Sequence, residues 1–467
     1  MIRLLLLGCS LAAFATGGWG VACGAEPLLA GVAVADVTPP VPYRMSGYFN
    51  ERLSTGVKDP LRAKVVVLRQ GEVQAALAFC DLIGIPAEVS ARVRQRASKA
   101  TGIPAENIVV AATHSHTGPL YYDALRDHFH QRTVERLGSD PHEAIDYPAE
   151  LATKVAAAIE SAHAALAPVE LKAGFAHEKR LAFNRRFLMK DGTVRFNPGQ
   201  LNPDVVRPVG PIDPQVGVIS LAKPGAPEPY AALVSFALHL DTTSGTEYSA
   251  DYPYYMERRL REAFGPRFTA LFGAGTCGDI NHIDVATKQV RTAEQIGEML
   301  AETVEHGLKS DDLAAIVEPM LAVRSVTIDA PLQQYSVEEV AQAQADIGLV
   351  GSRELPFLDQ VAAYKIVDLQ SYDGPTAPLE VQVVRLSDDV AMVTLPTEVF
   401  VELGLAIKAA SPFKTTLVIE LANDSLGYIP TKKAFAEGSY ETVNSRVQPG
   451  SGEQLVKTAI DLLKEMK

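Results

Sequence analysis

Two histidines separated by one residue are the first candidates for chemistry in this sequence. The segment Ala112–Pro119 reads ATHSHTGP and contains His114 and His116. An apolar run over residues 107–112 predicts a strand that ends just before the pair. On an extended chain, residues i and i+2 point to the same side, so both rings can face one site. Because imidazole nitrogen is a common zinc ligand, the pair is a candidate metal or catalytic site.

Two further candidate ligands also follow predicted strands. His239 comes at the end of the apolar segment 231–238, and Glu398 follows the apolar segment 390–395. Other interpretations remain open for each. His239 could be a core histidine bonded to a backbone carbonyl, and Glu398 could be a carboxylate at a helix N-terminus. Several strand ends that supply two histidines and a glutamate nevertheless fit a zinc site at one edge of a sheet.

Two other motifs could also carry chemistry, but we assign a function to neither. The glycine-rich segment Gly273–Asn281, GAGTCGDIN, follows a predicted strand, but the lysine of a phosphate-binding loop is absent, which excludes that function. A second histidine pair, His128 and His130 in DHFHQ, lies in a charged segment with no strand before it. We interpret this second pair as solvated surface.

The elements that must position these residues alternate between short apolar runs and amphipathic stretches, which predicts an α/β fold of mixed β-sheets with flanking helices. No internal repeat and no clear domain boundary is visible, and residues 181–214 are expected to form a long loop. The expected strands are 63–68, 74–79, 107–112, 216–221, 231–238, 268–272, 379–386, 390–395 and 416–421. The expected helices are 86–100, 148–166, 252–264, 292–308, 336–347, 399–410 and 453–466.

The composition limits the class of protein. The chain has 467 residues, a formal net charge of −13 and 47% hydrophobic residues, which is typical of a globular protein. The acidic balance argues against nucleic acid as a partner. After the N-terminus, no apolar run reaches the roughly 20 residues that a transmembrane helix needs.

The N-terminal residues 1–25 have the three parts of a secretory signal peptide: a start with Arg3, an apolar stretch, and small residues up to Ala25. The mature domain would then span residues 26–467, and the protein would be exported to the periplasm or the medium. Lipid attachment at Cys23 is disfavoured, because Gly20 stands where such a site prefers a larger apolar residue. Only Cys80 and Cys277 would remain, and the sequence does not say whether they pair.

From about Gly31 onward, the chain resembles the neutral, non-lysosomal ceramidases, which are zinc amidases that release a fatty acid from sphingosine. The resemblance rests on ADVTPP, on MSGY at residues 45–48 and on ATHSHTGP. It also rests on IDPQVGVISL at residues 212–221, on the segment around His239 and on the C-terminal block LGYIPTKKAFAEGSY. These blocks cover the catalytic region of the family almost from end to end.

The resemblance implies one zinc ion per chain and assigns a role to eight residues. The metal ligands would be His114, His239, Glu398 in LPTEVF and Tyr428 in LGYIPT. The substrate-facing residues would be His116, Arg185 in FNRRFLM and Tyr440, with Arg186 left open as an alternative to Arg185. The eighth residue, Asn281, falls where the family has a serine with an assigned catalytic role.

Two departures bear on the substrate. Asparagine cannot act as a hydroxyl nucleophile, although its amide can orient water or polarise a carbonyl. Ceramidases also continue into a C-terminal β-sandwich domain, which this sequence is expected to lack because it stops at Lys467. Both departures weaken the assignment to ceramide more than the assignment to a zinc hydrolase.

The expected chemistry is amide hydrolysis by water whose pKa a bound zinc ion lowers to about 7. His116, Arg185 and Tyr440 would stabilise the oxyanion or protonate the leaving amine. Asp279 or Asp251 would orient the ligand histidines, with helix capping as the alternative. The expected substrate is ceramide or a related N-acyl lipid. The alternatives are a soluble amide or ester at the same metal site, and a non-catalytic binding protein that keeps the fold.

Overall fold

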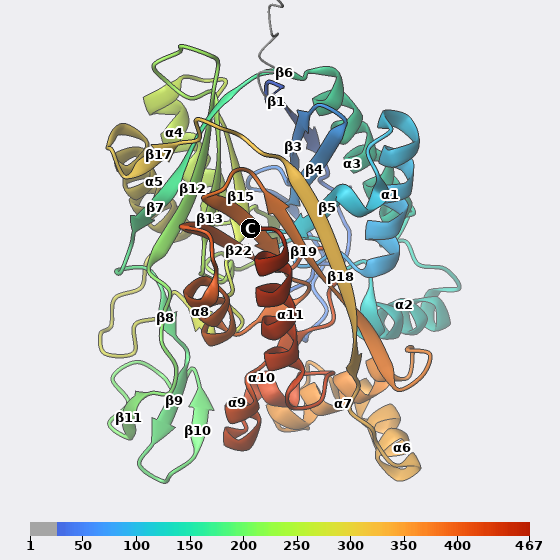
Figure 1. Ribbon diagram of the computed structural model, residues 1–467. Helices are drawn as coiled ribbons and strands as arrows, with labels where there is room; N and C mark the ends of the chain where they lie inside the picture. Colours follow the sequence, from blue (N-terminus) through green and yellow to red (C-terminus); the bar gives the residue numbers. More distant parts are fainter. Residues whose placement is uncertain (1–25) are drawn as a thin grey trace, which may run out of the picture.

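The computed structural model describes residues 26–467, and the predicted signal segment 1–25, with Cys9 and Cys23, lies outside the described residues. Three larger β-sheets and their helices make up most of the chain (Figure 1). The first sheet has the strand order β5-β4-β3-β1-β6, the second β15-β13-β12-β7-β17 and the third β18-β19-β20-β22. Their bounds are β1 Leu29–Asp36, β3 Arg62–Gln70, β4 Val73–Cys80, β5 Ile108–Ala112, β6 Ala167–Pro168, β7 Glu170–His177, β12 Gln215–Ala222, β13 Ala231–Phe236, β15 Thr269–Ala274, β17 Leu313–Ala315, β18 Ala322–Pro331, β19 Thr376–Arg385, β20 Val390–Thr394 and β22 Thr415–Ile419.

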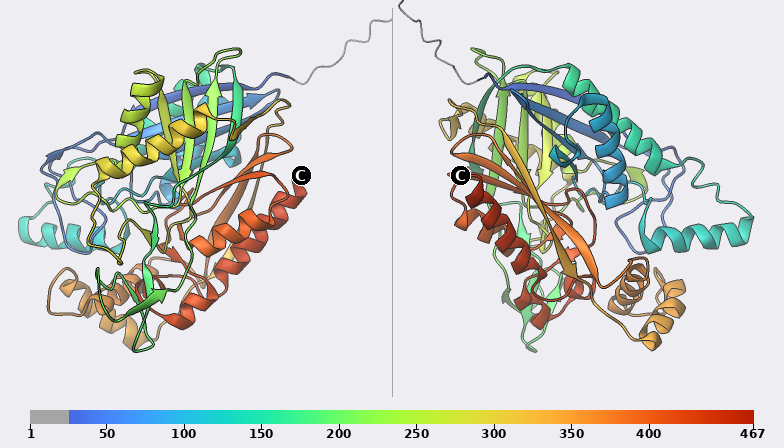
Figure 2. Two further views of the ribbon diagram at one scale, coloured as in Figure 1. Left: turned by 90° about the vertical axis from the view of Figure 1, so that its left-hand side faces the viewer. Right: turned by 45° about the vertical axis from the view of Figure 1, so that its right-hand side comes forward.

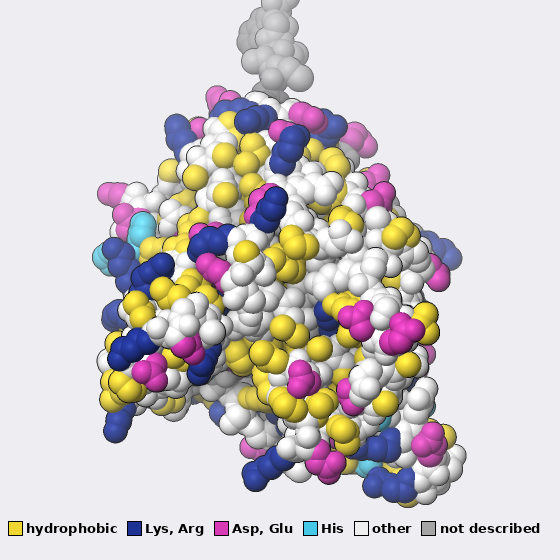
Figure 3. All heavy atoms as spheres, turned by 90° about the horizontal axis from the view of Figure 1, so that it is seen from below, with side chains coloured by type: hydrophobic (Ala, Val, Ile, Leu, Met, Phe, Trp, Pro, Cys, Tyr) yellow, Lys and Arg dark blue, Asp and Glu magenta, His cyan; other side chains and the backbone are white. Residues whose placement is uncertain are grey.

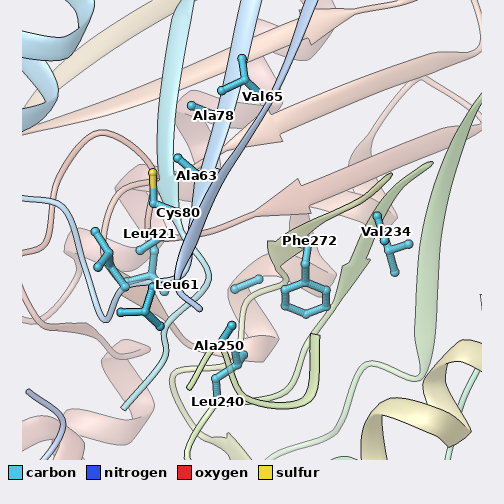
Figure 4. Packing of buried hydrophobic residues seen from close by; sticks show 14 of the residues in the cluster. Leu61, Ala63, Val65, Ala78, Cys80, Val234, Leu240, Ala250, Phe272 and Leu421 are labelled. Atoms are coloured by element: carbon cyan, nitrogen blue, oxygen red, sulfur yellow. The ribbon is translucent and has the colours of Figure 1, made fainter. Parts of the chain in front are cut away.

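The period of two along each strand distributes the apolar side chains between a shared inner core and an outer layer. In β3, Val66 and Leu68 face a central core to which all three sheets contribute, while Val65 and Val67 face the opposite way. Figure 4 shows part of the outer packing, including Val65 on β3 and Phe272 on β15. Strands such as β3 and β15 bury apolar side chains on both faces. Their sequences are therefore continuous apolar runs and do not alternate between apolar and polar residues.

Three pairs of helices cover the outer faces of the sheets (Figures 1 and 2). Helices α1 and α3 contribute buried residues to the outer layer of the first sheet, α4 and α5 do the same on the second, and α8 and α11 on the third. Local signals fix their ends: α5 begins with a capping box between Thr292 and Gln295, and α1 ends at Gly102 with φ 77°. The bounds are α1 Ala87–Thr101, α3 Tyr147–Ala164, α4 Tyr252–Phe264, α5 Ala293–Lys309, α8 Val401–Ala410 and α11 Ser451–Glu465.

Smaller elements complete the chain, and several of them lie at the lower end of the molecule in Figure 1. The strands β9, β10 and β11 form a three-stranded sheet, and the remaining short strands form the pairs β14-β2, β16-β8 and β21-β23. The bounds are β2 Gly56–Val57, β8 Phe183–Asn184, β9 Arg186–Met189, β10 Val194–Phe196, β11 Val205–Pro208, β14 Glu247–Tyr248, β16 Ile280–Asn281, β21 Glu398–Val399, β23 Tyr428–Ile429, α2 Asp123–Leu137, α6 Val337–Asp346, α7 Phe357–Leu369, α9 Lys432–Glu437 and α10 Tyr440–Val443. Two 3-10 turns, Ala105–Asn107 and Ile347–Leu349, are also present.

Each large sheet contains one parallel pair of strands, and each pair supplies one predicted ligand. The parallel pairs are β4–β5, β13–β15 and β20–β22. His114 follows β5, His239 follows β13, and Glu398 follows β20. Ligand sites in α/β folds lie beyond the carboxyl ends of parallel strands. The three sheets therefore converge on one site from three directions.

The predicted mixed α/β class is confirmed, and all the expected helices and strands are present within a few residues. The long loop expected over residues 181–214 is wrong, because β8, β9, β10 and β11 lie within it. Buried Phe187 and Met189 anchor this segment, but the surrounding Asn, Pro and Gly residues masked the strand pattern. The strands β1, β7 and β18 and the helices α2 and α7 are present as well, although the sequence pattern did not predict them.

Two smaller points follow from the described residues. Cys80 and Cys277 are both buried free thiols, so they do not form a disulfide with each other. Within residues 26–467, no helix combines the length and the apolar character that crossing a membrane would require.

Candidate metal centre

His114, His239 and Glu398 meet at the common edge of the three sheets. The Nε2 atoms of His114 and His239 are 3.0 Å apart. The Oε2 atom of Glu398 lies 3.2 Å from the first nitrogen and 3.4 Å from the second. Both histidines are buried. Three potential metal ligands, one from each sheet, thus share one small volume.

The hydrogen bonds of the two Nδ1 atoms determine whether the Nε2 atoms of His114 and His239 can bind a metal. The Nδ1 of His114 lies 2.7 Å from the carbonyl oxygen of Ile83, and that of His239 lies 3.0 Å from the carbonyl oxygen of Cys277. A carbonyl only accepts, so each Nδ1 carries the proton and each Nε2 presents a lone pair. Because two such lone pairs and a carboxylate face one another, a cation is the group that satisfies them.

An orphaned oxygen supports the same conclusion. Among the described residues, the Oε2 of Glu398 is buried and has no hydrogen-bond partner. Burial alone would raise the pKa of Glu398, but His114, His239 and Tyr428 lower it to about 2. Burial, the charge of Arg185 and the nearby His114 hold the pKa of His239 well below its usual range. A charged carboxylate beside a neutral imidazole is the donor set that zinc prefers.

His116 joins the cluster as a third ring. Its Nε2 is 3.3 Å from that of His114, and its Nδ1 is 3.0 Å from the carbonyl oxygen of Gly47. Together His114, His116 and His239 form a candidate metal-binding group. Burial and His114 lower the pKa of His116 to about 4, so this ring is neutral as well. The geometry therefore allows His116 either to bind the cation or to face a substrate beside it.

The backbone conformation at His114 differs from the extended chain expected from the sequence. The strand β5 ends at Ala112, and His114 has φ 84°, a left-handed conformation that costs about 1–3 kcal/mol in a non-glycine residue. Thr397, directly before Glu398, has φ 60°. The rings of His114 and His116 consequently meet edge to face, with centroids 4.9 Å apart. Strain of this kind is concentrated at functional sites.

Tyr428 reaches the cluster through strand pairing. The short strands β21 and β23 are parallel, and their register places Glu398 opposite Tyr428. The hydroxyl of Tyr428 interacts with the Glu398 carboxylate and accepts a hydrogen bond of 3.1 Å from Nη2 of Arg185. The structure therefore brings all four predicted ligands together, although coordination by Tyr428 stays a prediction.

Arg185 and Arg186 have different partners, which resolves the choice between them. Arg185 donates to the Tyr428 hydroxyl, to the carbonyl of Gly278 and to Oε1 of Glu441. Its guanidinium also lies 5.8 Å from the centre of the Tyr440 ring. Arg186 bonds the other oxygen of Glu441 and points toward α9. Only Arg185 therefore contacts the site.

Three other predicted residues lie close by but are engaged in structural hydrogen bonds. Asn281 donates to Asn197 over 2.6 Å and accepts from the backbone of Ile283 over 3.0 Å. Asp279 accepts from the backbone of Val401 at the start of α8, and Asp251 caps α4. Capping, the alternative given for the two aspartates, is what the structure shows. Backbone carbonyls, rather than carboxylates, orient the three histidines.

A cavity of about 500 Å3 opens beside the cluster. His114, His116, Glu398, Tyr428 and Tyr440 line its inner end. The rest of its wall combines aromatic side chains with charged and hydroxyl groups: Tyr48, Phe49, Tyr122, Asp123, Tyr364, Asp368, Ser371, Tyr372, Asp424, Ser425, Asn444 and Arg446 are among them. Its size lies within the range of small-molecule sites.

The second histidine pair is not the solvated surface that we expected, because it belongs to a helix whose His130 bonds a carboxylate. His128 and His130 lie on α2, and His130 bonds Asp140 over 2.8 Å. His130, Asp140 and Glu143 also form a geometrically possible metal group. Arg44 already forms ion pairs with both carboxylates, at 2.5 and 2.8 Å. The charge of this group is therefore satisfied without a cation.

The residues that sequence reasoning missed are those that act through the backbone. The carbonyls of Gly47, Ile83 and Cys277 fix the three histidines, and no side-chain signal could reveal them. The motif MSGY is visible in the sequence, but the reason for its glycine is not: a β-carbon at Gly47 would lie 2.4 Å from the carbonyl oxygen of His116. Close approach of backbones explains this glycine.

Gly278 provides a test of how tightly the centre is packed. A β-carbon at this position would lie 2.9 Å from the carbonyl oxygen of Glu398, and backbone atoms cannot move aside as a side-chain end can. Gly278→Ala is expected to lower the free energy of unfolding by about 1–3 kcal/mol and to weaken binding of a cation at the candidate metal centre. Gly348→Ala, where the β-carbon meets open space, is the matched control. Urea unfolding and zinc titration of both variants would check this, and equal behaviour would contradict it.

Comparison with known proteins supplies the fold class. No protein-family model matches the chain, and no curated protein matches it. The crystal structure of neutral ceramidase from Pseudomonas aeruginosa matches with a TM-score of 0.71 at 19% identity, over 94% of this chain and 74% of that one. A ceramidase complexed with C2 matches with a TM-score of 0.70 at 18% identity, over 94% and 75%.

The molecule is thus an α/β protein with a candidate metal centre at converging strand ends. Its fold is that of neutral ceramidase, as the resemblance in the sequence predicted.

Proposed function

We propose that this protein is an exported, zinc-dependent amidohydrolase that cleaves the N-acyl amide of ceramide or a related N-acyl lipid. One observation carries the proposal: the Nε2 atoms of His114 and His239 and the Oε2 of Glu398 converge at a cavity, in a chain with the fold of neutral ceramidase. In this proposal one zinc ion per chain is held by His114, His239, Glu398 and Tyr428.

The chemistry that zinc supplies when bound is a water molecule of pKa about 7 and polarisation of the amide carbonyl. The residues of the chain perform the other tasks. Tyr440 lines the cavity, so its hydroxyl can donate a hydrogen bond to the developing oxyanion. The Nδ1 of His116 faces the carbonyl of Gly47, so its Nε2 can accept a proton from the attacking water and then pass it to the leaving amine. Arg185 acts through Tyr428, because its Nη2 hydrogen bond fixes that hydroxyl. This route assigns no proton transfer to Asn281.

Aromatic and exposed apolar side chains near the cavity support a lipid substrate. The rings of Phe49, Phe196 and Phe357 pack around Tyr440, with Phe196 stacked on it at 4.7 Å. Phe357 and Leu358 on α7 are 42% and 39% exposed. Figure 3 shows this end of the molecule from below, where hydrophobic atoms gather in the middle of the face. Apolar surface of this kind commonly serves ligand binding.

The polar part of the cavity wall favours the alternative, a smaller soluble amide or ester. Asp123, Asp368 and Asp424 line the cavity, but Arg446 is the cationic side chain among its lining residues. A long alkyl chain would remove water from these carboxylates, which is unfavourable even though each also accepts hydrogen bonds from the protein. The replacement of the family serine by Asn281 also supports a changed substrate. A substrate with hydroxyl or amino groups therefore fits this wall better than a substrate with a long alkyl chain.

Hydrolysis of matched substrates distinguishes these functions. The mature protein is incubated with a fluorogenic short-chain ceramide and with a soluble N-acyl amino acid, with and without a zinc chelator. Turnover of ceramide that the chelator abolishes is the expected result. Chelator-sensitive turnover of the soluble amide alone would replace the lipid substrate by the alternative. A protein that holds one zinc per chain but hydrolyses neither would support the non-catalytic binding protein.

We also propose that the protein reaches the periplasm or the medium after removal of residues 1–25, as the composition of that segment supports. N-terminal sequencing of protein recovered from an expressing bacterium is expected to begin at Glu26. Recovery of the full-length chain from the cytoplasm alone would contradict export.

A further inference from the structure

A buried carboxyl group behind the candidate metal centre bonds two segments that lead to its predicted ligands. Glu420 follows β22 and is fully buried. Its Oε1 accepts hydrogen bonds of 3.1 Å from both the backbone nitrogen and the thiol of Cys277. Its Oε2 accepts a hydrogen bond of 2.6 Å from the backbone nitrogen of Val399. One side chain thus joins the segment after β15 to the segment after β20.

Both of these segments carry a contact to the metal centre. The carbonyl of Cys277 accepts the Nδ1 proton of His239, and Val399 is the residue directly after Glu398. The same two segments are joined again by a hydrogen bond from the nitrogen of Gly278 to the carbonyl of Val399. Any movement of Glu420 therefore shifts the ring of His239 relative to the carboxylate of Glu398.

The backbone around Glu420 is fixed to the same elements. Its nitrogen donates to the carbonyl of Ala274 at the end of β15, and the nitrogen of Leu421 donates to the carbonyl of Thr397. Leu421 has φ 59°, so the chain turns sharply at this point. Glu420 does not line the cavity, so a substrate does not reach it. Glu420 can therefore influence the site through the predicted metal ligands but not by contact with a substrate.

We infer that Glu420 is a positioning residue for the metal centre, which sets the distance between His239 and Glu398. The inference rests on the proposed metal site and adds a residue that neither the motifs nor the family resemblance assigns. Residues that support metal ligands typically change metal affinity by about 10–100-fold when they are replaced. Glu420→Gln retains the shape, but its amide nitrogen cannot accept, so one of the two backbone N–H groups loses its partner.

The test measures zinc affinity by chelator competition and the absorption spectrum of the cobalt-substituted protein. Glu420→Gln is expected to weaken zinc binding about 10–100-fold and to alter the cobalt spectrum. The matched control is Glu257→Gln, a buried carboxylate on α4 that pairs with Lys64 over 3.1 Å and with Arg261 over 3.0 Å. Glu257→Gln is expected to lower thermal stability and to leave both metal measurements unchanged. Wild-type affinity and spectrum in Glu420→Gln would overturn the inference.

A second measurement uses the unaltered protein, in case the variant does not fold. In the metal-free protein, the amides of Cys277 and Val399 are expected to resist hydrogen exchange, because Glu420 bonds them without any ion. Exchange as fast as that of the exposed residues 287–290 would overturn the inference. A wild-type protein that binds zinc at His114 but hydrolyses no amide would contradict the proposed function and leave this inference standing. A wild-type protein without metal affinity at this site would overturn both.

Discussion

Replacement of His114 by alanine is expected to abolish zinc binding and to reduce amide hydrolysis by on the order of 10³-fold or more. The Nε2 of His114 lies at the centre of the cluster, 3.0 Å from that of His239 and 3.2 Å from Oε2 of Glu398. Its removal leaves His239, Glu398 and Tyr428, and the first sheet no longer supplies a ligand. Metal content by atomic emission and initial rates on the preferred substrate are the measurements.

The stability of this variant is informative as well. In the metal-free state, burial opposes a charge on His114, but Glu398 raises its pKa, so a proton there partly replaces a cation. Alanine keeps a β-carbon, so His114→Ala retains the strained backbone at φ 84°. We therefore expect the metal-free variant to unfold at a lower temperature than the metal-free wild type, because the buried Oε2 of Glu398 loses this partner. His177→Ala, at an exposed position at the end of β7, serves as the control with full activity. Zinc content and rates that match the wild type in His114→Ala would contradict the assignment.

Glu441→Gln is expected to cause the largest loss of stability, about 3–5 kcal/mol in the free energy of unfolding. Glu441 is fully buried and pairs with two buried arginines, with Arg185 over 2.9 Å and with Arg186 over 2.9 Å. The neutral amide leaves two guanidinium groups in the interior with one anionic partner fewer. Guanidinium chloride unfolding, followed by fluorescence of the tyrosines, gives the free energy.

The control for this prediction is Glu437→Gln. Glu437 pairs with Arg186 over 3.3 Å, but its side chain is 21% exposed, so water compensates its loss and the expected change is about 0–1 kcal/mol. Because Arg185 also fixes the hydroxyl of Tyr428, the Glu441 variant is expected to lose activity at temperatures where it is still folded. Equal stabilities of the two variants would show that the buried ion pairs do not hold this part of the molecule.

Sequence patterns predicted the elements that carry the site because those elements are buried on both faces. The continuous apolar runs of β5, β13 and β20 mark their ends clearly, and His114, His239 and Glu398 follow within a few residues. The strand β18 was missed for the opposite reason. Most of its side chains are at least partly exposed, so its sequence carries no apolar run. Its pairing with β19 decides its structure, and such pairing is not a local property.

Some features of the candidate metal centre could not be predicted from the sequence, because they too depend on contacts between segments that are far apart in the chain. The family resemblance identified side chains that could bind zinc, but the backbone carbonyls that orient them depend on contacts between sheets. Cys277 illustrates this: its thiol drew notice, whereas its carbonyl bonds His239. The choice between Arg185 and Arg186 likewise required the position of Tyr428, which lies more than 200 residues further along the chain. Arg185 lies between β8 and β9, and consecutive residues of an extended chain point to opposite sides, so only the packed structure shows which of the two arginines faces the site.

The measurement that tests the account most directly is anomalous diffraction at the zinc absorption edge from a crystal of the zinc-loaded protein. The account predicts one strong peak per chain, among the Nε2 atoms of His114 and His239 and the Oε2 of Glu398. A peak at His130, Asp140 and Glu143 instead, or no peak at the three-sheet edge, would contradict it.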